Sequence, residues 1–110
     1  MEPQGFFHIA DLSSLRQRSG NRYLEFLRIP AMSAGLYVLA AGVTDPQKPH
    51  HQDELYYVVS GRARMQAGEE DREVTAGSII FVAAEVKHRF YDIQEELMVV
   101  VFFAPAESEA

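Results

Sequence analysis

Apolar and polar positions alternate along most of this chain in short runs, which is the pattern of β-strands. Val, Ile, Tyr and Phe dominate the runs, and such side chains pack well on a half-buried pleated surface. The predicted strands are residues 22–29, 33–41, 55–59, 62–66, 79–82, 88–93 and 96–103. Turn residues separate several of them, at Ser60-Gly61, 68–71 and Ala76-Gly77. Strands of this length at spacings of ~8–12 residues predict an all-β sandwich or barrel.

A helical pattern is expected only at residues 11–18, whose sequence is DLSSLRQR. Asp11 is a suitable N-cap, and Leu12 and Leu15 fall on one side of the helix. We expect one or two turns that cross an open end of the barrel. Residues 107–110 form a polar tail that we expect to fray.

A length of 110 residues predicts a single domain over residues 1–110. Its core is expected at 22–104, with an N-terminal segment at 1–21 and a polar tail at 105–110. A chain of this size buries roughly two thirds of its unfolded surface, which is enough for one core.

The charge and composition exclude several classes of partner. A net charge of −6 argues against nucleic acid or an anionic membrane, because both select basic surfaces. The chain has no cysteine, so disulfides and thiolate metal sites are excluded. The first thirty residues lack the pattern of a signal peptide, and no apolar run approaches the ~20 residues of a membrane span. We therefore expect a soluble cytoplasmic protein.

The last predicted strand contains seven consecutive apolar residues, 97–103. Such a run indicates that both faces of the strand are covered, whereas one face of a single barrel wall would meet water. A homodimer explains the second covered face. The alternative is that the N-terminal segment folds over it.

Three residues on two predicted strands could form a metal site. Residues of equal parity in an extended strand point the same way, so Glu54 shares a face with Tyr56, and His88 with Phe90. His50 joins the side of Glu54 if the preceding loop is extended. Two imidazoles and one carboxylate suit divalent iron, manganese, nickel or zinc, and leave positions open for water or substrate. Each residue also fits a structural role, as a hydrogen-bonded histidine or a surface glutamate.

The spacing of these residues resembles the two motifs of the cupin family. The first motif, G-x5-H-x-H-x(3,4)-E-x6-G, is matched by His50, Glu54 and Gly61. The second, G-x5-P-x-G-x2-H-x3-N, is matched by Gly77 and His88. The chain is identified as similar to small single-domain bacterial cupins of the RmlC-like superfamily. The resemblance implies a double-stranded β-helix, or jelly-roll, barrel with a short N-terminal helical segment.

The chain also departs from the family pattern. Lys48 stands where the first motif histidine is usual, and Asp92 stands where Asn is usual. His51 could replace the missing ligand if the loop bulges, and Gln52 could do so without a bulge. Water could complete a three-ligand site, and a vestigial pocket without metal stays open as an alternative.

Barrels of this kind enclose a pocket lined by inward side chains. The predicted lining is Tyr37, Leu39, Tyr56, Val58, Phe81 and Phe90, with Met98 as a further candidate. A lining with few charges favours a small, partly apolar ligand over a highly phosphorylated one.

Three functions fit these observations. The first is a metal-dependent enzyme of small-molecule metabolism, a dioxygenase, lyase or isomerase. The second is a non-catalytic module that binds or senses a small ligand with a reduced or empty metal site. The third is a structural cupin whose role is dimerisation. Fold resemblance alone does not choose between them, because one fold hosts many chemistries.

Overall fold

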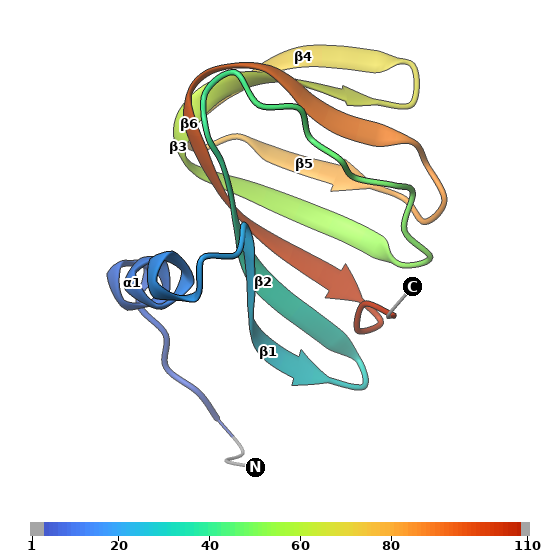
Figure 1. The fold of residues 1–110 in the computed structure, drawn as a ribbon. Helices are drawn as coiled ribbons and strands as arrows, with labels where there is room; N and C mark the ends of the chain where they lie inside the picture. Colours follow the sequence, from blue (N-terminus) through green and yellow to red (C-terminus); the bar gives the residue numbers. More distant parts are fainter. Residues whose placement is uncertain (1–3, 109–110) are drawn as a thin grey trace.

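One strongly bent antiparallel sheet wraps around the core, with an N-terminal helix on its outside (Figure 1). The computed structural model describes residues 4–108. Its elements are α1 (Ile9–Ser19), β1 (Tyr23–Ile29), β2 (Met32–Leu39), β3 (Asp53–Ala67), β4 (Glu70–Thr75), β5 (Ile79–Val82) and β6 (His88–Ala104). The strands lie in the order β1-β2-β6-β3-β4, and β5 pairs with β3. This arrangement confirms the predicted all-β class with a short N-terminal helix.

Strands β3 and β6 are each one long bent strand where the sequence predicted two. Ser60-Gly61 was expected to be a turn, and that prediction is wrong. Gly61 has φ 100°, and a Cβ there would lie 2.2 Å from the carbonyl oxygen of Glu96 on β6. A glycine at this point lets β3 bend and approach β6 closely without leaving the sheet. Asp92 has φ 49° inside β6 and marks the corresponding irregularity there.

Strand β4 was not predicted. Its sequence is EDREVT, and Val74 is its single buried residue. The strand pairs with residues 62–67 of β3 at one end of the order of strands. Because almost all of β4 is exposed, its sequence does not alternate between apolar and polar residues. The sequence pattern therefore placed part of it, residues 70 and 71, in a turn.

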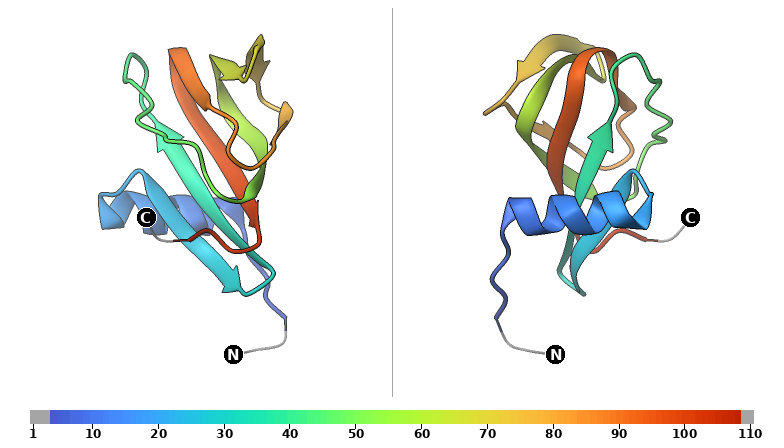
Figure 2. Two further views of the ribbon diagram at one scale, coloured as in Figure 1. Left: turned by 90° about the vertical axis from the view of Figure 1, so that its right-hand side faces the viewer. Right: turned by 60° about the vertical axis from the view of Figure 1, so that its left-hand side comes forward.

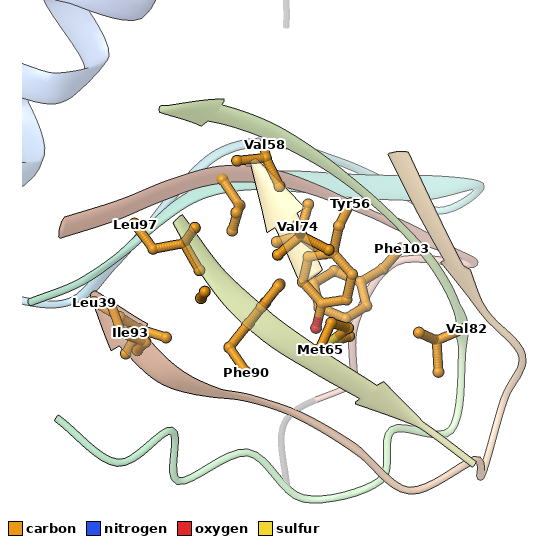
Figure 3. Packing of buried hydrophobic residues seen from close by; sticks show 13 residues of the cluster. Leu39, Tyr56, Val58, Met65, Val74, Val82, Phe90, Ile93, Leu97 and Phe103 are labelled. Atoms are coloured by element: carbon orange, nitrogen blue, oxygen red, sulfur yellow. The ribbon is translucent and has the colours of Figure 1, made fainter. Parts of the chain in front are cut away.

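The interior of the barrel is filled by aliphatic and aromatic side chains (Figure 3). Leu39, Val58 and Phe90 are buried there, as expected for inward positions. Phe81 was also expected to face inward, and that is wrong because its side chain is 61% exposed on β5. Its neighbours Ile80 and Val82 take the inward positions, so Phe81 points outward.

Helix α1 packs on the outer face of the sheet (Figure 2). It does not cross an open end of the barrel, and its N-cap is His8, not Asp11. Leu12 packs there with Leu36, Val38 and Val100 in a second apolar cluster. Met98 packs against this cluster too, so it is not a pocket residue.

The helix therefore covers part of the outer face of the apolar run 97–103, where Leu12 clusters with Val100. The sequence offered such a covering by the N-terminal segment as the alternative to a dimer. In the part of the chain that the structure describes, no helix is long and apolar enough to cross a membrane.

Candidate metal centre

His50, Glu54 and His88 converge in the interior, with one ligand atom from each within 4.8 Å of the others. Glu54 Oε2 lies 3.1 Å from Nε2 of His88, and Glu54 Oε1 lies 3.7 Å from Nε2 of His50. Glu54 and His88 are only 2% and 6% exposed. The structure thus brings together the three residues that the sequence singled out as metal ligands.

The fold explains why residues so far apart in sequence meet. Glu54 lies at the start of β3, where the alternating burial of 54, 56 and 58 turns it inward. His88 begins β6 opposite Ala67, near the other end of β3. Because both long strands bend around the core, the two side chains meet across the interior. His50 reaches the same place from the loop before β3.

Nδ1 of each histidine, the ring nitrogen that faces away from the centre, has a partner of its own. His88 Nδ1 lies 2.9 Å from the carbonyl oxygen of Val86, which can only accept, so an N–H on Nδ1 donates to it. His50 Nδ1 lies 3.3 Å from Oε2 of Glu107. Partners at Nδ1 fix the ring orientation and direct Nε2 towards the centre, which is the usual support of metal-binding histidines.

Burial and charge shift the pKa values of the groups in the centre. Burial raises the pKa of Glu54, against the lowering effect of the two histidines. The hydrogen bond to Glu107 raises the pKa of His50 above its ordinary 6.5, although burial opposes this. Burial also raises the pKa of Tyr56 well above its usual range, so this hydroxyl stays protonated. Tyr56 donates to Glu54 Oε1 over 2.9 Å.

Gln47 is a residue of this centre that sequence reasoning missed. Its Oε1 lies 3.3 Å from His50 Nε2 and 3.4 Å from His88 Nε2. It also lies 2.7 Å from Tyr56 Oη and is the alternative acceptor, beside Glu54, for the single proton of that hydroxyl. No sequence signal marked it, because it lies in an irregular loop and outside the motif positions.

A buried carboxylate, Asp45, holds Gln47 in place. Its oxygens accept from Nε2 of Gln47 over 2.8 Å and from the backbone N–H of Phe90 over 2.9 Å. Tyr37 donates to Asp45 over 2.9 Å. The loop before β3 is therefore tied to β6 at the edge of the centre.

The two expected fourth ligands lie elsewhere. His51 has a side chain that is 74% exposed and pairs with Glu85. The amide nitrogen of Gln52 donates to Ser108 Oγ over 2.9 Å. Lys48 is exposed, and Asp92 is exposed in β6. Instead, the carboxamide of Gln47 lies beside both Nε2 atoms.

A cavity of about 130 Å³ adjoins His50 and Gln47. Of the predicted pocket residues, Tyr37 and Tyr56 line it. Leu39, Val58 and Phe90 instead belong to the packed core. Glu107, from the tail that was expected to fray, forms another part of the lining. Its backbone N–H donates to Ser33 Oγ over 2.8 Å, so the tail is tied down through residue 108.

Comparison with known proteins gives consistent results. An uncharacterized protein from Streptomyces coelicolor is 50% identical over 102 residues, which is 93% of this chain and 97% of that protein. The crystal structure of BH2720 from Bacillus halodurans has a TM-score of 0.77 at 19% identity, over 97% of this chain and 86% of that one. The DMSP lyase DddQ from Ruegeria pomeroyi has a TM-score of 0.67 at 18% identity, and the match covers 76% of this chain. This chain spans about half of that lyase, 47% of its length.

The family model for the cupin domain matches residues 35–104. This range runs from within β2 to the end of β6 and includes the three converging side chains. The spacing of His50, Glu54 and His88, the bent antiparallel barrel and the matched model agree with one another. The chain belongs to the cupin family.

Proposed function

We propose that this chain is a metal-dependent enzyme of small-molecule metabolism, with a divalent ion of iron, manganese, nickel or zinc held by His50, Glu54 and His88. The observation that supports it is the convergence of the two Nε2 atoms and one buried carboxylate within 4.8 Å. Two imidazoles and one carboxylate form a ligand set that leaves positions for substrate.

The residues around the centre fit such an ion. Val86 and Glu107 occupy the Nδ1 sides of the two rings, so both Nε2 atoms are available as ligands. When bound, the ion supplies Lewis-acid or oxygen-binding chemistry for a dioxygenase, lyase or isomerase reaction. The Tyr56 hydroxyl lies between Glu54 Oε1 and Gln47 Oε1 and stays protonated, so it can donate a hydrogen bond to a substrate oxygen.

Metal binding is tested by equilibrium dialysis of the purified protein against Fe²⁺, Mn²⁺, Ni²⁺ and Zn²⁺. We expect about one ion per chain, and the loss of at least nine tenths of it in His50→Ala and in His88→Ala. His51→Ala is the matched control, because His51 is a neighbouring histidine outside the centre. Equal metal content in all three variants would contradict the proposal. Consumption of O₂ during turnover then separates a dioxygenase from a lyase or isomerase.

One observation favours a second candidate, a non-catalytic small-ligand cupin with a reduced metal site. Glu54 pairs with His88 over 3.1 Å, and Gln47 Oε1 lies beside both histidines. These polar groups can therefore be one another's hydrogen-bond partners without a metal ion. Thermal-shift measurements distinguish the two candidates. Stabilisation by organic ligands but by none of the four divalent ions would favour the second.

We also propose a homodimer, through the outer face of β3 and β5. Leu55, Tyr57, Ile79 and Phe81 are all exposed there, and they pair across the strands as Leu55 with Phe81 and Tyr57 with Ile79. An exposed apolar cluster of this kind is typical of an interaction site. Light scattering after gel filtration should give twice the mass of one chain, and Phe81→Glu should give the monomer. A monomeric wild-type protein at high concentration would contradict this.

A further inference from the structure

The segment before α1 carries an aromatic side chain that its own chain does not cover. Phe6 is 95% exposed, although the ring of the next residue, Phe7, packs on Phe26 of β1 with ring centroids 5.0 Å apart. The segment projects away from the barrel (Figure 1), and the views in Figure 2 agree. The ring of Phe6 is therefore available to the surface of a second molecule.

Phe7 also lines an apolar groove on the outer face of the sheet. The groove has a volume of about 310 Å³ and lies between the N-terminal segment, α1 and strands β1, β3 and β6. Tyr57 of β3 lines it together with Phe102 of β6. Because Tyr57 also pairs with Ile79 of β5, the groove is continuous with the exposed apolar cluster of β3 and β5.

The exposed apolar area on this side of the molecule is close to that of a dimer interface. Six apolar side chains contribute to it, and their exposed fractions correspond to roughly 700 Å² in all. Monomeric proteins rarely leave so large an apolar patch in water, and a standard interface buries about 800 Å² per partner. The six side chains are Phe6, Phe7, Leu55, Tyr57, Ile79 and Phe81.

Charge favours a second copy of the chain as the partner. All outward positions at which β3 pairs with β5 and β6 on this face are uncharged, so two copies can meet here without like-charge repulsion. The net charge of −6 opposes nucleic acid and anionic lipid. The outward positions are Leu55, Tyr57, Ile79, Phe81, Val100 and Phe102.

The groove and strand β5 are complementary under two-fold symmetry. Strand β5 lies two strands away from β6, a distance of about 10 Å. A two-fold axis between the groove and β5 lays the groove of each copy on β5 of the other. Phe7 lines the groove, so the neighbouring Phe6 stands at its rim and faces the β5 strand of the second copy.

We infer that residues 4–8 form an arm that lies on the second copy in the dimer, with Phe6 packed against the partner's Ile79 and the partner's Phe81. This inference rests on the homodimer proposed above and adds the segment that holds it together. The arm and α1 precede the 35–104 range of the cupin domain match, so this part of the interface comes from a flanking segment of the chain.

Phe6→Ala tests the arm, because a side chain that is 95% exposed contributes little to the folding of a single chain. In sedimentation equilibrium, Phe6→Ala should raise the dimer dissociation constant by about 10-fold or more. Leu15→Ala is the matched control and should leave it unchanged, since Leu15 is exposed on α1 and does not line the groove. At concentrations where every variant is monomeric, both should unfold as wild type does.

Cross-linking locates Phe6 in the dimer. The chain has no cysteine, so an introduced pair reports which positions meet. In an equimolar mixture under mild oxidation, Phe6→Cys should link to Ile79→Cys at least about ten times faster than Leu15→Cys does, because a disulfide needs Cα atoms within about 7 Å.

The outcomes separate the arm from the dimer. A dimer that Phe6→Ala leaves as stable as wild type, or equal cross-linking by the two pairs, would refute the arm and leave the homodimer standing. A monomeric wild type would overturn both, and its binding to phosphatidylcholine vesicles would assign the face to a membrane instead.

Discussion

The side-chain oxygen of Gln47 lies 3.4 Å from Nε2 of His88, although the two residues are 41 positions apart. The same oxygen lies 3.3 Å from Nε2 of His50. A neutral carboxamide oxygen therefore stands beside both imidazoles, in a chain that has Lys48 at the usual place of the first motif histidine. Gln47, the residue before Lys48, thus places a side-chain oxygen beside the two histidines.

Gln47→Ala should weaken the binding of a divalent ion by about 10- to 100-fold, the usual cost of losing a supporting group at a metal site. The change removes an oxygen from the centre and deprives Tyr56 of an acceptor. Isothermal titration with Zn²⁺ measures the effect. Lys48→Ala is the matched control because Lys48 is the exposed next residue. If both variants bind Zn²⁺ as wild type does, Gln47 has no part in the centre.

Glu107→Gln should lower the pKa of His50 in the metal-free protein, because the hydrogen bond to Glu107 is the largest cause of its elevation. NMR titration of the His50 ring signals measures this pKa. A pKa raised in the folded state stabilises the protein below the unfolded value, and this contribution is lost as the pH rises through the folded value. The difference in unfolding free energy between wild type and Glu107→Gln should thus be present below pH 6.5 and vanish at alkaline pH. Glu69→Gln, at an exposed turn, should show neither effect.

Gly61→Ala should destabilise the fold far more than Gly77→Ala. Both glycines have positive φ, 100° and 94°, so an alanine at either pays a backbone cost of about 1–2 kcal/mol. At Gly61 the new Cβ also meets the carbonyl oxygen of Glu96 at 2.2 Å, whereas nothing lies within 4 Å of it at Gly77. Urea unfolding should show a loss above about 4 kcal/mol for Gly61→Ala, or no folded protein. Equal losses would mean that β3 does not bend against β6 as described.

Leu12→Ala should cost about 2–4 kcal/mol of unfolding free energy, because Leu12 is buried between α1 and the outer face of the sheet. Leu15→Ala on the same helix should cost less than about 0.5 kcal/mol, since Leu15 is 47% exposed. Chemical denaturation of both variants compares them directly. A Leu12→Ala protein as stable as wild type would show that α1 does not pack on the outer face of the sheet.

The fold was predictable wherever one face of a strand is buried. The alternation around Glu54 and Phe90 identified parts of β3 and β6. The spacing of His50, Glu54 and His88 relative to the two motif glycines identified the family. Strand β4 was missed because a solvent-exposed strand at the sheet edge carries no such pattern, as its single buried residue Val74 illustrates. Gly61 was interpreted as a turn residue because glycine, which readily adopts a positive φ, occurs both in turns and at bends within strands.

The candidate site was predictable only at its motif positions. His50, Glu54 and His88 follow from motif spacing and parity. Gln47 and Glu107 come from an irregular loop and from the C-terminal tail, whose paths depend on contacts such as Asp45 with Phe90 that no local pattern encodes. For the same reason the fourth ligand was sought at His51 and Gln52, which lie closer to Glu54 in sequence but point elsewhere.

The most direct test of the central claim is an anomalous difference map from crystals of protein purified without chelators or a metal-affinity column, then soaked in Fe²⁺ or Zn²⁺. The account predicts one peak about 2.0–2.2 Å from Nε2 of His50, from Nε2 of His88 and from a carboxylate oxygen of Glu54. A map without a peak at this position, with Glu54 still paired to His88 after the soak, would contradict it.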